Sequence, residues 1–162
     1  LDQIVAVIRA MEAEERIHET KGRVNIIGRR ELLTERVKDA IDYAESKTAD
    51  YDQFVFTVCL AYGSREEMIT AIQSIAKDFA AGDISLDAIN QQAVSDRLYT
   101  ADMPDPDLVI RTSGEERISN FLLWQMAYSE LYFTDVFWPS FSKKDLLKAI
   151  RTYQERGRRY GE

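Results

Sequence analysis

Two arginines and a serine follow a short apolar run in the second half of the chain. Arg111 comes directly after Leu108-Val109-Ile110, and Arg117 and Ser119 lie six and eight residues after Arg111. Guanidinium and hydroxyl groups suit an anion that has several oxygens, such as phosphate or diphosphate. If the intervening loop folds back, the two arginines could clamp one diphosphate while the serine adds a hydroxyl.

The acidic neighbours of these arginines leave a second interpretation open. Glu115, Glu116 and Asp107 could pair with the arginines on the surface without any ligand. Gly114 favours the ligand interpretation, because a residue without a side chain lets the backbone come close to a bound molecule. Spacing alone does not decide between the two.

A second glycine turn leads into a predicted helix. Residues 61–65 read Ala-Tyr-Gly-Ser-Arg, with Ser64 as the predicted N-cap and Glu67 reaching back in a capping box. The first N–H groups of a helix attract anions. We therefore expect backbone N–H groups, hydroxyls and an arginine to converge at both turns. Arg65 stands beside Glu66, so a solvated ion pair is its expected role.

Three single residues are further candidates for chemistry. Glu130 is a lone carboxylate among aromatic residues, either hydrogen-bonded and structural or a ligand of Mg²⁺, which prefers carboxylates together with phosphate oxygens. His18, the only histidine, is expected on the surface, which argues against a histidine-based triad. Cys59, the only cysteine, is expected to be a buried, unreactive thiol in a protein of a reducing compartment.

Hydrophobic periodicity indicates which elements position these residues. It predicts helices over residues 2–19, 31–47, 64–81, 85–98, 120–129 and 142–160, and strands over 24–27, 54–60 and 107–111. The strand over 54–60 has almost no polar residue, which favours a strand covered on both faces. Strands that alternate with long helices imply an α/β fold, a parallel β-sheet flanked by helices. Ligands bind beyond the carboxyl ends of such strands.

Composition narrows the class of protein. The 162 residues suit one domain, and 45% apolar with 30% charged residues is a globular balance. A formal charge of -7 does not favour nucleic acid as a partner. No stretch reaches the roughly 18 apolar residues of a membrane span. We expect a cytoplasmic protein.

An aromatic-rich tract lies between residues 124 and 141. Its members could form core, or they could form a contact between subunits, since aromatic side chains are enriched at interfaces. They are Trp124, Tyr128, Tyr132, Phe133, Phe137, Trp138 and Phe141.

The stretch DLVIRTSGEERISNFLLWQMAYSELYFTDVFWPSF, residues 107–141, closely resembles the C-terminal signature of the cis-prenyltransferases, a family that includes undecaprenyl diphosphate synthase. VNIIG at 24–28 and AYGSREEM at 61–68 resemble the family's corresponding strand–turn regions. The resemblance covers nearly the whole chain and is specific because the motif is long. It implies an undecaprenyl diphosphate synthase-like fold.

The resemblance also implies an activity. Such enzymes are transferases of isoprenoid biosynthesis that condense isopentenyl diphosphate with an allylic diphosphate such as farnesyl diphosphate. The product is a long-chain polyprenyl diphosphate, and the reaction uses Mg²⁺. The family implies a homodimer formed through the aromatic tract, and an apolar product implies transient contact with a membrane. Ile4, Ile8, Val55 and Val58 are expected either as walls of an apolar tunnel or as core.

Site residues follow from the resemblance position by position. Arg111, Arg117 and Ser119 match the residues that hold the diphosphate of isopentenyl diphosphate, and Glu130 matches a glutamate associated with Mg²⁺. The sequence Arg159-Tyr160-Gly161 looks like the Arg-x-Gly motif, in which an arginine and a glycine, here Arg159 and Gly161, reach the diphosphate site across the dimer interface.

The chain departs from the family pattern in two places. The family's Asp-Gly-Asn-Gly-Arg-Trp loop would lie upstream of Leu1, so we assign no catalytic residue. We expect residues 1–162 to be the C-terminal part of a single domain, with an incomplete fold. Glu116 stands where many bacterial members have histidine, which puts a metal contact there in doubt.

Two other functions stay open. One is a non-catalytic partner subunit of a cis-prenyltransferase, although such partners tend to lose the arginine cluster that is intact here. The other is a generic phosphate-binding α/β domain.

Overall fold

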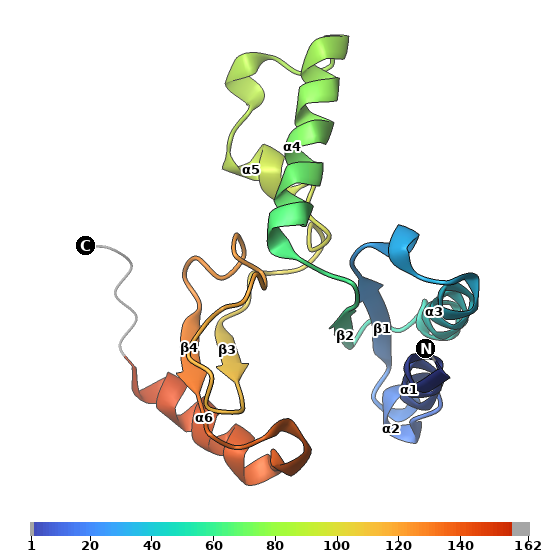
Figure 1. The fold of residues 1–162 in the computed structure, drawn as a ribbon, viewed down its shortest axis with the longest axis vertical. Helices are drawn as coiled ribbons and strands as arrows, with labels where there is room; N and C mark the ends of the chain where they lie inside the picture. Colours follow the sequence, from blue (N-terminus) through green and yellow to red (C-terminus); the bar gives the residue numbers. More distant parts are fainter. Residues whose placement is uncertain (1, 157–162) are drawn as a thin grey trace. The chain divides into compact units, whose positions relative to one another are not determined.

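The computed structural model describes residues 2–156, apart from the side chains of Asp2 and Glu12. The chain divides into two compact units, Leu1–Glu67 and Met68–Glu162. Each unit contains a two-stranded parallel sheet, which several helices contact in the first unit and the C-terminal helix contacts in the second (Figure 1). This is the α/β arrangement with parallel strands that the sequence predicts.

The first unit is built around a strand–helix–strand motif. Its elements are α1 (Asp2–Glu12), α2 (Glu15–Glu19), β1 (Gly22–Ile27), η1 (Arg30–Leu32), α3 (Glu35–Thr48) and β2 (Phe54–Cys59), followed by the start of α4 (Ser64–Ala81). β1 pairs with β2 in parallel, with Ile26 opposite Val58. Parallel strands need a crossover connection, and α3 supplies it.

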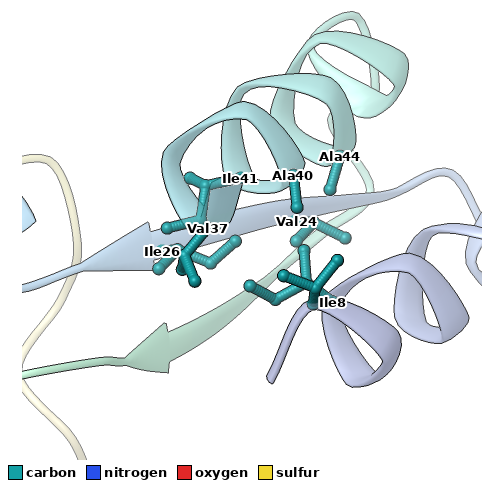
Figure 2. Close-up of a cluster of buried hydrophobic side chains, with 8 residues drawn as sticks. Ile8, Val24, Ile26, Val37, Ala40, Ile41 and Ala44 are labelled. Atoms are coloured by element: carbon teal, nitrogen blue, oxygen red, sulfur yellow. The ribbon is translucent and has the colours of Figure 1, made fainter. Parts of the chain in front are cut away.

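The core of the first unit lies between β1 and two helices that cover the same face of the sheet (Figure 2). Val24 and Ile26 alternate along β1, so both point to this face, where they meet Ile8 of α1 and Ile41 of α3. Ile41 is completely buried. Full burial of such a side chain stabilises the fold by about 1.5–3 kcal/mol.

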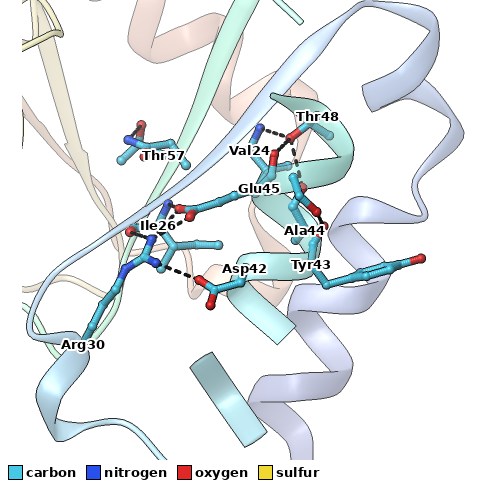
Figure 3. A network of polar contacts seen from close by, with 11 residues as sticks. Val24, Ile26, Arg30, Asp42, Tyr43, Ala44, Glu45, Thr48 and Thr57 are labelled. Carbon is cyan, nitrogen blue, oxygen red and sulfur yellow. Dashed lines mark hydrogen bonds and ion pairs between the residues drawn. The ribbon is translucent and has the colours of Figure 1, made fainter. Parts of the chain in front are cut away.

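The edge of β1 that faces away from β2 is closed by side chains of α3 (Figure 3). The N–H of Val24 donates to Thr48 Oγ1 at 3.0 Å, and the N–H of Ile26 donates to Glu45 Oε1 at 2.8 Å. Arg30 holds the Glu45 carboxylate at 2.6 Å. An unpaired strand edge can associate with the strands of other chains. These bonds occupy the N–H groups at the edge of β1, so they protect it from such association as well as stabilising it.

The second unit contains the rest of α4, η2 (Leu86–Ala88), α5 (Gln91–Ser95), β3 (Leu108–Arg111), β4 (Glu130–Phe133), η3 (Trp138–Ser140) and α6 (Lys143–Glu155). β3 and β4 are parallel, with Leu108 opposite Glu130 and Arg111 opposite Phe133. α6 packs against both strands. The long connection between the strands is tied to α5, because Trp124 Nε1 donates to Ser95 Oγ at 3.0 Å.

The prediction of a helix over residues 120–129 is wrong, and a strand was missed beside it. The structure has turns there because Asn120 and Leu122 adopt positive φ angles of 62° and 45°, which no right-handed helix contains. One helical turn remains, with the N–H of Met126 bonded to Leu122 O at 2.9 Å. The aromatic residues that follow pair as β4, a four-residue strand too short to show a period.

Three other elements differ from expectation. The helix predicted over 2–19 is interrupted between α1 and α2. The helix predicted over 85–98 is a 3₁₀ turn followed by the short α5, which begins where the Asn90 side chain caps the N–H of Ala93. Residues 54–56 of β2 are 39–45% exposed within the described residues, whereas the sequence favours a strand covered on both faces.

A helix long and apolar enough to cross a membrane does not occur within residues 2–156.

Candidate functional site

The loop after β3 folds back on the strand end, and Arg111 closes it. Its Nη1 donates to Ser119 Oγ at 3.1 Å and also to the backbone carbonyl of Arg117. The guanidinium therefore joins residues six and eight positions further along the chain. Arg111 is placed there because it is the last residue of β3, at the carboxyl end where ligands of parallel sheets bind.

Arg117 lies at the same loop but is oriented by an acidic neighbour. Its Nη1 forms an ion pair with Glu115 Oε2, and its side chain is 65% exposed. The surface pairing that the sequence left open is therefore present for this arginine. An exposed pair of this kind contributes about 0–1 kcal/mol, so an anion with several oxygens could displace it at small cost.

Both arginines line one cavity of about 240 Å³ in the second unit. Ser119 is the third polar residue of the lining, and the remainder is apolar, including Ile118, Phe121 and Leu131. The cavity thus has polar donors from the loop and an apolar wall from the loop and strands. This combination suits a small molecule with an anionic head and a short hydrocarbon tail.

The backbone around this cavity is unusual. Ser113, Ser119, Asn120 and Leu122 all adopt left-handed conformations, with φ between 45° and 72°. Such conformations cost about 1–3 kcal/mol each and cluster at ligand sites.

The backbone N–H groups of Ser113 and Gly114, the two that follow Thr112, are bonded to backbone carbonyls of the protein. The N–H of Ser113 bonds to Val136 O and that of Gly114 to Thr134 O, each at 2.9 Å. A side chain at Gly114 would lie 3.1 Å from Asp135 Oδ1, and its φ is +69°. Gly114 therefore permits a close approach of two protein segments.

Within the described residues, Glu130 lies at the other end of the strand pair from Arg111. It begins β4 opposite Leu108, whereas Arg111 lies opposite Phe133, three residues or about 10 Å along the strand pair. The Glu130 carboxylate accepts from Arg156 Nη1 at 2.8 Å, and the same nitrogen donates to Leu131 O at 3.0 Å. Sequence reasoning missed Arg156, which stands at the C-terminal end of α6.

Two further predictions concern metal and the chain end. Among the side chains that the structure describes, no three potential metal-binding groups of His, Cys, Asp and Glu gather together. Arg159 and Gly161 lie outside the described residues.

The turn after β2 is closed by buried polar groups. Tyr62 Oη donates to Glu67 Oε2 at 2.6 Å, and Glu67 and Ser64 are almost completely buried. Burial and then the bond to Glu67 raise the pKa of the Tyr62 hydroxyl, so it stays protonated and donates. α4 begins at Ser64, so Ser64 is the first residue of the helix and not the N-cap that the sequence predicts. A side chain at Gly28 would meet Leu60 O at 2.0 Å, so the turn is tightly packed.

The neighbouring thiol has the unreactive character that the sequence predicts. Cys59 ends β2 and is half-buried. Burial, and to a smaller extent the charge of Glu67, raises the pKa of Cys59 to about 11.

The first unit contains an apolar cavity of about 210 Å³. Ile4, Ile8 and Val58, three of the four predicted tunnel walls, line it together with Val7, Met11 and others. Val55, the fourth, is not part of this lining and is 39% exposed.

The aromatic tract divides into two groups. Trp124 is half-buried and hydrogen-bonded to Ser95, as a core residue would be. Tyr128, Phe137 and Trp138 are 67–82% exposed. Large exposed aromatic side chains of this kind are typical of contact surfaces.

Comparison with known proteins establishes the class. A family model described as "Putative undecaprenyl diphosphate synthase" matches residues 1–161. The chain belongs to this prenyltransferase family.

Particular relatives are similar over most of the chain. The geranylgeranyl-diphosphate-specific tritrans,polycis-undecaprenyl-diphosphate synthases of Pyrococcus horikoshii and Methanopyrus kandleri are 48% and 50% identical to it over 153 residues, 94% of this chain. The chain spans 58% and 56% of the length of these two relatives.

Two solved structures have the same fold. The lavandulyl diphosphate synthase of Lavandula x intermedia, in complex with dimethylallyl diphosphate, matches with a TM-score of 0.94 and 34% identity, over 98% of this chain and 68% of that one. A probable undecaprenyl diphosphate synthase from Campylobacter jejuni matches with a TM-score of 0.84 and 26% identity, over 99% of this chain and 72% of that one. The predicted fold class and the predicted family are confirmed.

Proposed function

We propose that the protein containing this chain is a cis-prenyltransferase that condenses isopentenyl diphosphate with an allylic diphosphate to give a long-chain polyprenyl diphosphate. The observation that carries the proposal is the single cavity lined by Arg111, Arg117 and Ser119. Family membership and the named synthases among its relatives support the reaction class.

The cavity has the chemistry to hold isopentenyl diphosphate. Guanidinium groups bind diphosphate oxygens through charge-assisted hydrogen bonds, and Arg111 and Arg117 line the cavity together with Ser119. A five-carbon tail would lie against residues such as Ile118 and Phe121. Fixing the tail in one orientation lowers the entropic part of the barrier to condensation.

The growing chain needs an apolar path, and the first unit offers a candidate wall. The cavity beside Ile4, Ile8 and Val58 has no polar side chain except Gln3 in its lining. We propose that it contacts the hydrocarbon product. The names of the archaeal relatives specify geranylgeranyl diphosphate, so this primer is to be tested beside farnesyl diphosphate.

Mg²⁺ remains part of the proposal, although no three potential metal-binding groups gather among the described side chains. Mg²⁺ is usually held by one or two carboxylates together with substrate phosphates. Glu130 is the carboxylate that the family resemblance points to, and it is paired with Arg156 at the opposite end of the strand pair from Arg111. We derive no step of the reaction through the ion.

Homodimer formation is proposed through the exposed members of the aromatic tract. Tyr128, Phe137 and Trp138 offer apolar area that a partner copy could bury. Arg159 and Gly161 would then be supplied to the partner's diphosphate site. A cytoplasmic location is proposed with it.

A product assay tests the proposed function. The whole protein is incubated with an allylic diphosphate, radiolabelled isopentenyl diphosphate and Mg²⁺, and the products are separated by chromatography. We expect polyprenyl products that disappear in Arg117→Ala and persist in Arg16→Ala, a matched control whose side chain is 86% exposed.

Two results would overturn the proposal in favour of its alternatives. Turnover only after a second protein is added would indicate a partner subunit. Binding of phosphate compounds without any prenyl product would indicate a generic phosphate-binding domain.

A further inference from the structure

Three of the chain's seven lysines lie on α6, the red helix of Figure 1, and share one side of it with an arginine. Lys143, Leu147 and Arg151 follow one another at four-residue spacing, and Lys144 and Lys148 form a second row beside them. All five side chains are exposed. These five residues are called the basic face of α6.

Packing fixes the direction in which this face points. On the opposite side of the helix Ala149 is completely buried, and Ile150 and Tyr153 are half-buried. That apolar side packs on β3 and β4. The basic face therefore points away from the strands of its own unit.

The positive charge of this face runs against the charge of the chain. The chain carries a formal charge of -7, yet residues 143–151 contain four cations and one carboxylate. That carboxylate, Asp145, accepts from the N–H of Ser142 at 2.9 Å and caps the helix. Glu155, one turn beyond Arg151, adds a second negative charge only at the far end.

The middle of the face is apolar. Leu147 is 54% exposed and lies between the cations. An open hollow of about 730 Å³ is lined by the five residues of the basic face and by Asp145. Cations surrounding an exposed leucine match a layer of anionic headgroups above hydrocarbon, where lysines bind the phosphates and an apolar side chain reaches the boundary.

Other occupants fit less well. A second copy docked symmetrically on this face would place like charges against one another. Single-stranded nucleic acid is bound through aromatic stacking as well as charge, and the face has no aromatic residue. We propose that the basic face of α6 docks the protein on membranes that contain anionic lipids. This proposal does not depend on the proposed reaction.

Vesicle co-sedimentation of the whole protein, without substrates, tests the proposal. The probes are vesicles of phosphatidylcholine alone and of phosphatidylcholine with phosphatidylglycerol. We expect binding only to the anionic vesicles, and its loss near 1 M salt, where the screening length falls to about 3 Å. The triple variant Lys143→Gln, Lys144→Gln, Lys148→Gln should bind on the order of 100-fold more weakly, given the usual contribution of each lysine near an anionic surface.

The matched control removes three lysines elsewhere. Lys21→Gln, Lys47→Gln, Lys77→Gln makes the same change in net charge at exposed positions and should bind like the wild type. Leu147→Ser keeps every charge and should bind about three- to tenfold more weakly, because it removes apolar contact area. Circular dichroism verifies the fold, and Lys148→Gln alone replaces the triple variant if the triple does not fold.

Three outcomes would overturn the proposal. They are equal binding to neutral vesicles, equal losses in both triple variants, and tighter binding to a single-stranded oligonucleotide with the same dependence on Lys143, Lys144 and Lys148.

Discussion

The turns that follow β2 and β3 both look like anion sites in the sequence, but they use their polar groups in opposite ways. After β2, the half-buried Tyr62 donates to the buried carboxylate of Glu67. After β3, Arg117 is 65% exposed and Arg111 lines a cavity. The first turn is closed by its own hydrogen bonds, whereas the second leaves cationic groups beside a space that a ligand can enter.

The comparison shows what separates a structural turn from a binding turn. Buried polar groups must find partners within the protein, because an unsatisfied one costs about 1–3 kcal/mol. Exposed arginines do not need a buried partner, because water or a surface carboxylate can accept their hydrogen bonds. Site residues are therefore recognised by the polar groups that the fold leaves accessible, and glycine and hydroxyl residues alone do not identify them.

Replacing Arg111 should have the largest effect and tests whether the β3 turn is the binding turn. Arg111→Ala removes a cation and also opens the loop that Arg111 holds through Ser119. We expect kcat/KM for isopentenyl diphosphate to fall on the order of 10²–10³-fold. Arg111→Lys should recover part of the activity, because lysine keeps the charge but lacks the planar fork. Equal activity in Arg111→Ala and wild type would remove the distinction between the turns.

Replacing Tyr62 tests whether the β2 turn is structural. Tyr62→Phe leaves the buried Glu67 carboxylate without one donor and should lower the free energy of unfolding by about 1.5–3 kcal/mol. Tyr43→Phe, at a tyrosine that is 49% exposed on α3, is the control and should change it by less than about 0.5 kcal/mol. Urea denaturation measures both. A Tyr62→Phe protein of normal stability but weak substrate binding would make this turn a second ligand site.

These two turns also show how far the sequence alone could go. The extent of the long helix α4 was predicted to within one residue, because Gly63 and Gly82 flank eighteen residues of helical periodicity. For the β3 loop, the spacing of Arg111 and Arg117 raised a fold-back as one of two possibilities and did not decide between them. The pairing of Tyr62 with Glu67 was not predicted, because Glu67 also satisfied the capping-box pattern.

The remainder depended on contacts that are distant in sequence. The N–H of Gly114 is taken by Thr134, beyond β4, so its role could not be predicted once β4 had been missed. Residues 131–133 suit a buried helix as well as a strand, and pairing with β3 decides between them. The left-handed Asn120 and Leu122 belong to a loop whose preceding Ser119 is held by Arg111, and no local pattern indicates this.

Two substitutions beside β3 distinguish a metal-binding role of Glu130 from its ion pair with Arg156. Glu130→Gln and Arg156→Gln both break the same contact, but only the first removes a carboxylate. We expect Glu130→Gln to raise the Mg²⁺ concentration needed for half-maximal turnover about tenfold or more, as loss of a metal contact does. Arg156→Gln should leave it unchanged. Equal shifts in the two variants would make Glu130 a structural residue.

The smallest expected effect concerns the thiol beside the closed turn. A pKa of about 11 means that Cys59 carries little thiolate at pH 8, and alkylation by iodoacetamide should be about 100-fold slower than that of a free cysteine. Glu67→Gln removes a negative charge, lowers the Cys59 pKa and should accelerate alkylation by less than about tenfold, because burial is the larger cause. Rapid alkylation of the wild type would show that the β2 turn is open.

The most direct test of the central claim is calorimetric titration of the whole protein with isopentenyl diphosphate. The account predicts that Arg117→Ala weakens binding about 10- to 100-fold, which corresponds to loss of a charged donor. Arg16→Ala changes an exposed arginine that is distant in sequence from Arg117, and this variant should bind isopentenyl diphosphate as the wild type does. Equal affinity in the wild type and Arg117→Ala would contradict the assignment of the β3 turn as the diphosphate site.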